Sequence, residues 1–212
     1  MKSVLIDFDS IKKYAPDINA QNLNVVKIEV TEDTQFVVDL TALAVLPEIS
    51  IDFVFNKSKI NAHVIGVYSL NDNQKLNTKL RAVHNVPETS CLIDIKGALF
   101  DKSYSYHFGE IYIGKQAFNT ESYLSDHTLM LSEDVRTVSL PNLQIYNNNV
   151  KASHGASIGS VDSQKMYYLQ SRGIEKNDAI NILVSGFFES IFNDITDQNM
   201  ANVLREKLLT LQ

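Results

Sequence analysis

Residues 141–173 read PNLQIYNNNVKASHGASIGSVDSQKMYYLQSRG, and within this stretch the hydrophobic pattern of the chain changes. Before it, short runs rich in β-branched and aromatic residues predict strands. After Gly159, apolar residues recur at the spacing of a helix. The stretch therefore joins a β body to a helical tail. We expect a weakly structured segment at 1–24, a β core at 25–159 and a helical domain at 160–212.

The strand runs of the body recur every ten to fifteen residues. Ile49, Ile51, Phe53 and Phe55 fall on one face of a period-two pattern. No helix-length segment separates the runs, which excludes a parallel sheet of the βαβ type. A sandwich or barrel and a solenoid of stacked β-coils both remain open. The lack of Asn-Gly and Asp-Gly hairpin signals mildly favours the solenoid.

Three helices are expected in the tail. Asp162 is a candidate N-cap of the first, and Gly173 can take the left-handed turn after its last residue, Arg172. The second has one apolar stripe, in which Gly186 indicates a close approach by another backbone. A third helix starts near Asp197. The stripe consists of Ile180, Leu183, Val184, Phe187, Phe188, Ile191 and Phe192.

The composition is that of a globular protein, with 212 residues, 44% of them hydrophobic and 21% charged. A net charge of −6 argues against nucleic-acid binding. No apolar run approaches the ~20 residues of a membrane span, and the N-terminal run is too short for a signal peptide. The single cysteine, Cys91, cannot form an internal disulfide. We therefore expect a cytoplasmic protein that binds neither nucleic acid nor membranes.

Two strings match catalytic motifs, and neither fits its motif fully. Residues 155–159, GASIG, fit the G-x-S-x-G elbow of hydrolases, but that elbow needs its histidine later in the chain and His154 is the last one. Residues 109–115, GEIYIGK, fit a phosphate loop only up to the lysine, and Gln116 replaces the Ser or Thr that holds magnesium. The intervening EIYI has the pattern of a strand. The sequence predicts neither a serine hydrolase nor a bound nucleotide.

The cysteine and histidines show no metal-binding spacing such as CxxC or HExxH. Cys91 is expected to be a small core residue, and His63 a satisfied interior histidine. His154 differs, because a serine and a glycine flank it and leave room around the imidazole. The other histidines are interpreted as structural or surface residues: His84, His107 and His127.

Several segments carry a family resemblance by their order along the chain. They are 84–90 (HNVPETS), 96–97 (KG), 108–111 (FGEI), 129–132 (LMLS), 141–145 (PNLQI), 150–159 (VKASHGASIG) and 168–174 (YLQSRGI). Together they resemble the SufB/SufD family of iron–sulfur cluster assembly proteins, over roughly 25–192. The order His154-Gly155-Ala156 is similar to the SufD branch, so the chain looks like a shortened SufD-like member.

The resemblance implies a right-handed parallel β-helix for 25–159 and a non-enzymatic scaffold that carries a transient iron–sulfur cluster. It also implies that the C-terminal helices dock a SufC-like ABC ATPase. Because the family acts as a dimer, a SufB-like subunit or a second copy of this chain is the other expected partner. His154 is the residue implied at the dimer interface, as a cluster or metal ligand. The residues implied in partner binding are Tyr168, Arg172, Gly173, Phe187 and Phe188.

The chain departs from the family pattern near His154. Ala152 stands where many SufD members have a cysteine, and Asn148 and Asn149 replace the usual pair of aspartates, which removes two potential hard ligands. Two alternatives therefore stay open. One is a β-helical enzyme acting on polysaccharide, which would need carboxylates projecting together from adjacent coils. The other is a structural adaptor that has lost cluster chemistry.

Overall fold

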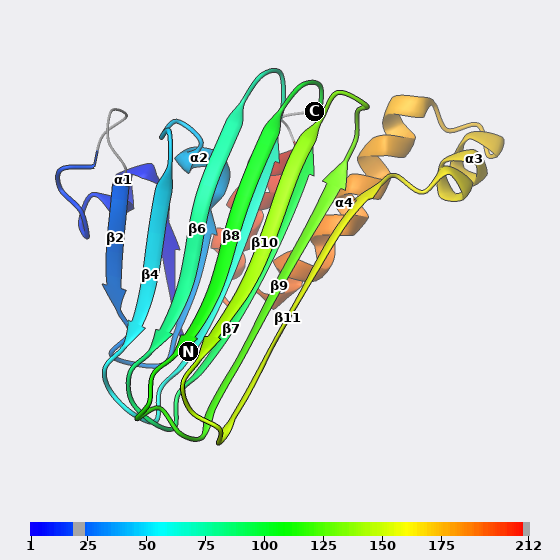
Figure 1. The fold of residues 1–212 in the computed structure, drawn as a ribbon. Helices are drawn as coiled ribbons and strands as arrows, with labels where there is room; N and C mark the ends of the chain where they lie inside the picture. Colours follow the sequence, from blue (N-terminus) through cyan, green and yellow to red (C-terminus); the bar gives the residue numbers. More distant parts are fainter. Residues whose placement is uncertain (19–23, 210–212) are drawn as a thin grey trace.

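The structure is a computed structural model that describes residues 1–18 and 24–209 (Figure 1). It is mainly β, with parallel strands stacked into a solenoid and small helices near the C-terminus, so the predicted fold class is confirmed. The strands are β1 (Lys2–Ile6), β2 (Asn24–Glu29), β3 (Thr34–Asp39), β4 (Ile49–Phe55), β5 (Asn61–Leu70), β6 (Lys75–His84), β7 (Ser90–Leu99), β8 (Tyr104–Ile113), β9 (Thr120–Met130), β10 (Arg136–Ile145) and β11 (Val150–Ser160). The helices are α1 (Phe8–Ile11), α2 (Leu40–Leu43), α3 (Ser163–Ser171), α4 (Lys176–Asp194) and α5 (Gln198–Leu209).

Successive strands alternate between two sheets. Within the described residues, one sheet has six strands in the order β1-β3-β5-β7-β9-β11, and the other has five in the order β10-β8-β6-β4-β2. Every neighbouring pair is parallel. A coil, meaning one strand in each sheet with its turns, therefore stacks directly on the coil before it. This is the arrangement of a parallel β-helix, with its core between the two sheets.

The core is built from the period-two positions that the sequence indicates. Ile49, Ile51, Phe53 and Phe55 of β4 have no exposed surface. The ring of Phe53 meets that of Phe36 from the opposite sheet at a centroid distance of 5.0 Å. Burying each such side chain contributes about 1.5–3 kcal/mol. Apolar residues at alternate positions thus hold the two sheets together.

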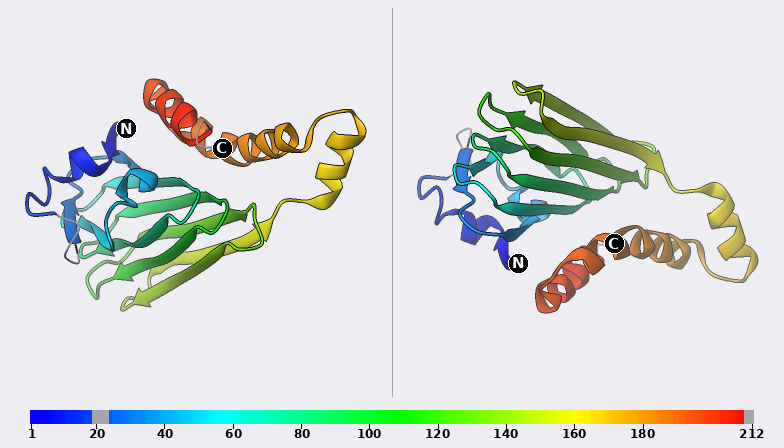
Figure 2. Two further views of the ribbon diagram at one scale, coloured as in Figure 1. Left: turned by 90° about the horizontal axis from the view of Figure 1, so that it is seen from above. Right: turned by 90° about the horizontal axis from the view of Figure 1, so that it is seen from below.

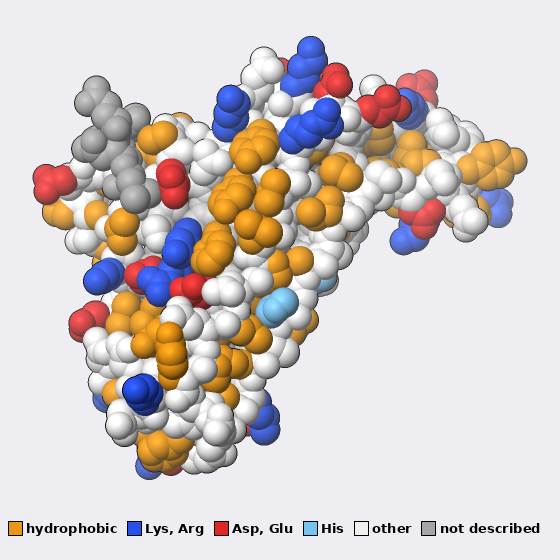
Figure 3. Space-filling model, viewed as in Figure 1, with side chains coloured by type: hydrophobic (Ala, Val, Ile, Leu, Met, Phe, Trp, Pro, Cys, Tyr) orange, Lys and Arg blue, Asp and Glu red, His pale blue; other side chains and the backbone are white. Residues whose placement is uncertain are grey.

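A row of polar side chains fixes the register on the outer face of the five-stranded sheet. Arg81 donates to Glu110 at 2.7 Å and to Asp52 at 3.2 Å, and Asn142 donates to the other oxygen of Glu110 at 2.9 Å. These residues are register partners on four adjacent strands. A slip by one residue would turn their side chains inward, so the row selects the observed pairing. Figure 3 shows charged side chains on this face beside a gathering of hydrophobic ones.

The N-terminal coil is closed by its own chain, and we call it the closed end. β1 pairs with β3, and α1 follows β1 with Asp7 as its N-cap, accepting from the backbone of Ser10 at 2.8 Å. Ile6 and Ile11 have no exposed surface. The segment 1–24, expected to be weakly structured, therefore supplies a strand and a cap over its described part. A strand this short has no recognisable pattern until its partner, some thirty residues later, is known.

The C-terminal coil, formed by β10 and β11, is open, and we call it the open end. Each of these strands lies at the last position of its sheet, and neither contains a fully buried residue. Leu140, Ile145 and Ile158 are 40–45% exposed. In the described part of the chain, nothing stacks on this coil as each earlier coil is stacked upon.

The helices divide between two locations (Figure 2). α4 and α5 lie along the outer face of the six-stranded sheet, whereas α3 projects away from the body. Phe188 and Phe192 of α4 share a buried cluster with Val37, Ile65 and Val67 of the sheet. The helical tail thus shares a core with the β-helix, and the division into domains at residue 160 stays a prediction. None of the helices described has the length and apolar character needed to cross a membrane.

Candidate functional site

The predicted interface residue His154 lies in the middle of β11, at the open end. Its register partner on β9 is Leu124, a core residue with 1% exposure. Partners in a parallel ladder point to the same side of the sheet, so His154 points toward the interior side of the coil. No further coil covers it, and its side chain is exposed. Within residues 1–18 and 24–209, no hydrogen bond fixes its imidazole.

The inward-facing neighbours of His154 along β11 are small or apolar. Val150 and Ala152, four and two residues before it, face the same side and pack against the core. Gly155 and Ala156 follow it on β11, and Ile158, which is exposed, completes the inner row. The imidazole therefore has apolar neighbours along its own strand, and it is open to another molecule.

Cys91 does not contribute to this surface. It is 2% exposed and belongs to the main core, so the predicted core role is confirmed. Burial raises the pKa of its thiol far above the usual range, and the nearby Asp94 carboxylate raises it further. A thiol held in its neutral form is a poor nucleophile and a poor metal ligand.

Three of the predicted partner-binding residues lie together at the end of α3, in the projecting part that we call the arm. Tyr168 is 57% exposed, and the Arg172 guanidinium lies 5.3 Å from the centroid of its ring. Gly173 has a φ of +85°, the left-handed turn that the sequence predicts after this helix. The predicted N-cap is also confirmed, since Asp162 accepts from Gln164 N at 2.8 Å. α3 has no buried residue.

The other two residues lie on α4 and face the β-helix. Phe188 is fully buried against the six-stranded sheet. Phe187 is half-buried, with the Lys96 ammonium 4.9 Å from its ring centroid. The structure therefore separates the five residues into an exposed group on the arm and a pair that fixes α4 to the sheet.

A cleft between α3 and α4 connects the two groups. It contains two cavities of about 430 and 400 Å³, and Ile182 and Leu183 line both. Tyr168 lies at one end of the cleft and Phe187 at the other. Gly186 also lines it, with no atom within 4 Å of the position of a Cβ. The close backbone approach expected at Gly186 is therefore wrong for this chain alone.

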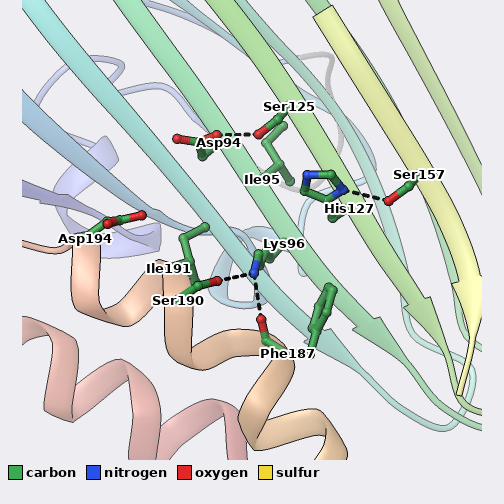
Figure 4. A pocket seen from close by; sticks show the side chains of 10 residues that line it. All are labelled: Asp94, Ile95, Lys96, Ser125, His127, Ser157, Phe187, Ser190, Ile191 and Asp194. Carbon is green, nitrogen blue, oxygen red and sulfur yellow. Dashed lines mark hydrogen bonds between the residues drawn. The ribbon is translucent and has the colours of Figure 1, made fainter. Parts of the chain in front are cut away.

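Sequence reasoning missed a polar cavity on the outer face of the six-stranded sheet, under α4 (Figure 4). We call it the α4 pocket, and its volume is about 450 Å³. Lys96, His127 and Ser157 lie in one row across β7, β9 and β11, because they are register partners. The residues lining the pocket are Asp94, Ile95, Lys96, Ser125, His127, Ser157, Phe187, Ser190, Ile191 and Asp194.

Charged groups in the pocket are partly desolvated and hydrogen-bonded. Burial alone would raise the pKa of Asp94, but hydrogen bonds from His63 and Ser125, with the charges of His63 and His127, outweigh it and lower the pKa. Burial lowers the pKa of Lys96, against the opposing effect of Asp194 and Asp94. The Lys96 ammonium donates one hydrogen bond to the carbonyl of Phe187 at 2.7 Å and another to the hydroxyl of Ser190.

His63 takes part in this network and is hydrogen-bonded at both ring nitrogens, as predicted, but it lies on the outer face of the six-stranded sheet rather than inside the coil. Its Nε2 lies 2.9 Å from Asp94 Oδ2, and its Nδ1 lies 3.3 Å from Gln35 Nε2. The residues in phase with it, Ile65 and Val67, are buried under the helices rather than inside the coil. Alternating apolar residues show only that one face of a strand is buried. In β5, the outer face of the six-stranded sheet is also buried, because the C-terminal helices cover it.

A spacing signal could have found these contacts. Residues that stack in adjacent coils are 25–32 apart in sequence, as in Val26–Ile51 at 25, Gln35–His63 at 28 and Asn142–Glu110 at 32. His127 and Ser157 are 30 apart. Because turn lengths vary, no clean repeat marks this period in the sequence.

Neither catalytic string adopts its motif's conformation. Residues 109–113 lie within β8, so the strand prediction for EIYI is confirmed and no phosphate-binding loop forms there. Residues 155–159 lie within β11 and make no strand-to-helix elbow. Among the described residues, no three or more His, Cys, Asp or Glu side chains gather in a way that could hold a metal ion.

Comparison with known proteins gives one consistent family. A profile described as "SUF system FeS cluster assembly, SufBD core domain" matches residues 12–187. An iron–sulfur cluster assembly SufBD family protein of Mycobacterium leprae is 32% identical over 143 residues, which is 64% of this chain and 36% of that protein. A SufBD family protein of Synechocystis is 27% identical, covering 67% of this chain and 29% of the relative. The iron–sulfur cluster assembly protein SufD of Escherichia coli is 29% identical, covering 50% and 25%. The match thus spans about a third or less of these relatives.

Proposed function

Since this chain belongs to the SufBD core-domain family of the SUF system for iron–sulfur cluster assembly, we propose that it is a non-enzymatic scaffold subunit of such a system. In this proposal the open end of the β-helix pairs with a SufB-like subunit or with a second copy. A transient cluster forms at that junction, and the arm docks a SufC-like ABC ATPase. The single observation that supports it most is the exposed His154 on the last strand of an uncovered coil.

The open end has the properties of an interface that contributes a ligand. β11 is an edge strand, which leaves backbone N–H and C=O groups ready to pair with a strand of another chain. Apolar side chains such as Ile158 and Leu140 would become buried by such pairing. A neutral imidazole is a competent iron ligand, and His154 would supply one position while the remaining ligands come from the partner.

The arm has the properties of a docking element. An aromatic ring with a guanidinium stacked on it, as in Tyr168 and Arg172, is a combination enriched at the centres of protein interfaces. Ile182, 48% exposed, and the open space at Gly186 would let a partner segment enter the cleft. Phe187 would line the edge of this contact, whereas Phe188 would act indirectly by fixing α4 to the sheet.

The first test replaces His154 with alanine in the reconstituted complex. As an exposed ligand, His154 can be lost without cost to folding, so the melting temperature should be unchanged while cluster assembly, followed by visible absorbance, falls about tenfold or more. Ser153→Ala, one residue away on the opposite face, is the matched control and should assemble clusters at the parent rate. Normal assembly by the folded His154→Ala variant would contradict the site assignment and favour the structural-adaptor alternative.

The second test concerns the arm. Removing residues 173–212 would strip the cover from Val37, Ile65 and Val67, so point changes are cleaner than deletion. Tyr168→Ala should weaken binding to a SufC-like ATPase by about 2 kcal/mol, roughly 30-fold in Kd, with no change in melting temperature. Tyr14→Ala, at an exposed tyrosine on the closed end, is the control. Equal affinity of both variants in a calorimetric titration would place the ATPase contact elsewhere.

A further inference from the structure

The hydroxyl of Ser157 meets an imidazole at the edge of the α4 pocket. Ser157 Oγ lies 2.6 Å from His127 Nδ1, across adjacent strands (Figure 4). Ser157 is exposed and His127 half-buried, so the hydroxyl can be reached from solvent. A serine hydroxyl within hydrogen-bond reach of a histidine is the arrangement by which a weak nucleophile becomes activated. Ser157 is also the serine of the G-x-S-x-G string, whose exclusion rested on chain order in the hydrolase elbow.

The surroundings of this pair form a site rather than an isolated surface contact. The α4 pocket, about 450 Å³, has a size typical of small-molecule sites. Phe187 and Ile191 of α4 line one side and offer an apolar wall to a short acyl chain. Lys96 occupies the same row as the pair, two strands from Ser157. Two of its three N–H groups are engaged, which leaves one for an oxygen in the pocket.

We propose that Ser157 is a nucleophilic acceptor that takes one acyl group from small activated esters or thioesters, with His127 as its general base. The Ser157 Oγ–carbonyl carbon bond forms while His127 Nδ1 takes the hydroxyl proton. The bond from the carbonyl carbon to the leaving oxygen or sulfur then breaks. His127 returns the proton to the leaving group, and acyl-Ser157 remains. No oxidant, metal or further reactant is required.

Two other residues have supporting roles in this scheme. Lys96 lines the same pocket, and its ammonium would stabilise the oxygen that becomes negative during attack. Asp94 interacts electrostatically with His127 and would stabilise the ring while it carries the extra proton. The pocket holds a nucleophile, a base and one cation, which suits a single acyl transfer to the protein. This inference does not depend on the scaffold function.

The test uses p-nitrophenyl acetate as the acyl donor and the full chain as the acceptor. The acetylated residues are identified and timed by peptide mass spectrometry. Ser153 is an internal control, because it lies four residues from Ser157 on the same strand and the same face. General-base assistance should make acetylation of Ser157 about 100-fold faster than that of Ser153. His127→Gln should remove most of that difference at an unchanged melting temperature.

Equal acetylation rates of Ser157 and Ser153 in the parent chain would overturn the proposal without any variant. So would an undiminished rate at Ser157 in a folded His127→Gln protein, because the hydrogen bond would then be structural only. A Lys96→Met variant separates the supporting role: slower acetylation with the Ser157–His127 contact intact is expected, and an unchanged rate would remove Lys96 from the scheme.

Discussion

The two ends of the β-helix solve the same physical problem in different ways. At the closed end, the short helix α1 covers the first coil, and Ile6 and Ile11 have no exposed surface. At the open end, β10 and β11 have no fully buried residue, although their inward positions continue the rows of the core. The difference teaches that this fold is stabilised from one end and leaves the other available to a second chain.

The largest expected effect is at the closed end. Ile11→Ala should lower the free energy of unfolding by about 2–5 kcal/mol, because it removes buried methylene groups and leaves a cavity under α1. Urea unfolding followed by circular dichroism measures it. A loss below about 0.5 kcal/mol would mean that α1 is not a structural cap, and the comparison between the ends would fail.

The second effect is expected from the interior between the ends, and it develops only on acidification. His84 is fully buried, stacks on Phe55 at 4.5 Å and hydrogen-bonds Thr89 at 2.8 Å, and burial lowers its pKa to about 3. Between pH 6.5 and about 3, the His84 imidazole is protonated in the unfolded chain but stays neutral in the folded chain. Stability attributable to His84 should therefore fall on acidification, by about 1.4 kcal/mol per pH unit in that window.

The measurement is the difference in unfolding free energy between the parent and His84→Gln as a function of pH. The variant, which cannot titrate, should show a shallower loss between pH 6.5 and 4. If the unfolding free energies of the parent and of His84→Gln changed equally with pH, water would reach the His84 ring. The part of the core that excludes water would then not extend to β6.

The smallest effect on stability is expected at the open end. Ile158→Ala changes a side chain that is 43% exposed, so the unfolding free energy should stay within about 0.5 kcal/mol of the parent. The same change should weaken association with a second copy or a SufB-like subunit in analytical ultracentrifugation. Unchanged association would remove the contrast between the two ends. So would a loss of unfolding free energy as large as that expected for Ile11→Ala.

Much of the fold could be predicted from the sequence, because period-two apolar patterning fixes which residues of a strand share a face. That patterning does not say which strand lies beside which, and the register row of Asp52, Arg81 and Glu110 was therefore invisible. β1 was missed for the same reason. The resemblance of ordered segments, rather than periodicity, selected the solenoid over the sandwich.

The candidate site was predictable only in part. His154 was identified through a local string, and its position on the last strand fits an interface role that stays a prediction. The His127–Ser157 contact was missed because motif rules count along the chain, whereas this fold brings together residues one coil apart. The apolar stripe of the second helix predicted that Phe188 is buried, but it did not identify the six-stranded sheet as the surface that buries it.

The uniform direction of stacking also bears on how the chain is made. Each strand from β3 onward pairs with one synthesised 25–32 residues earlier, and the closed end comes first. At translation rates of about 5–20 residues per second, a coil leaves the ribosome about every 1 to 6 s. Every new strand then meets a finished template and does not wait for later sequence. The protein can be laid down coil by coil, and the edge still unpaired when synthesis passes β11 is the one offered to a partner.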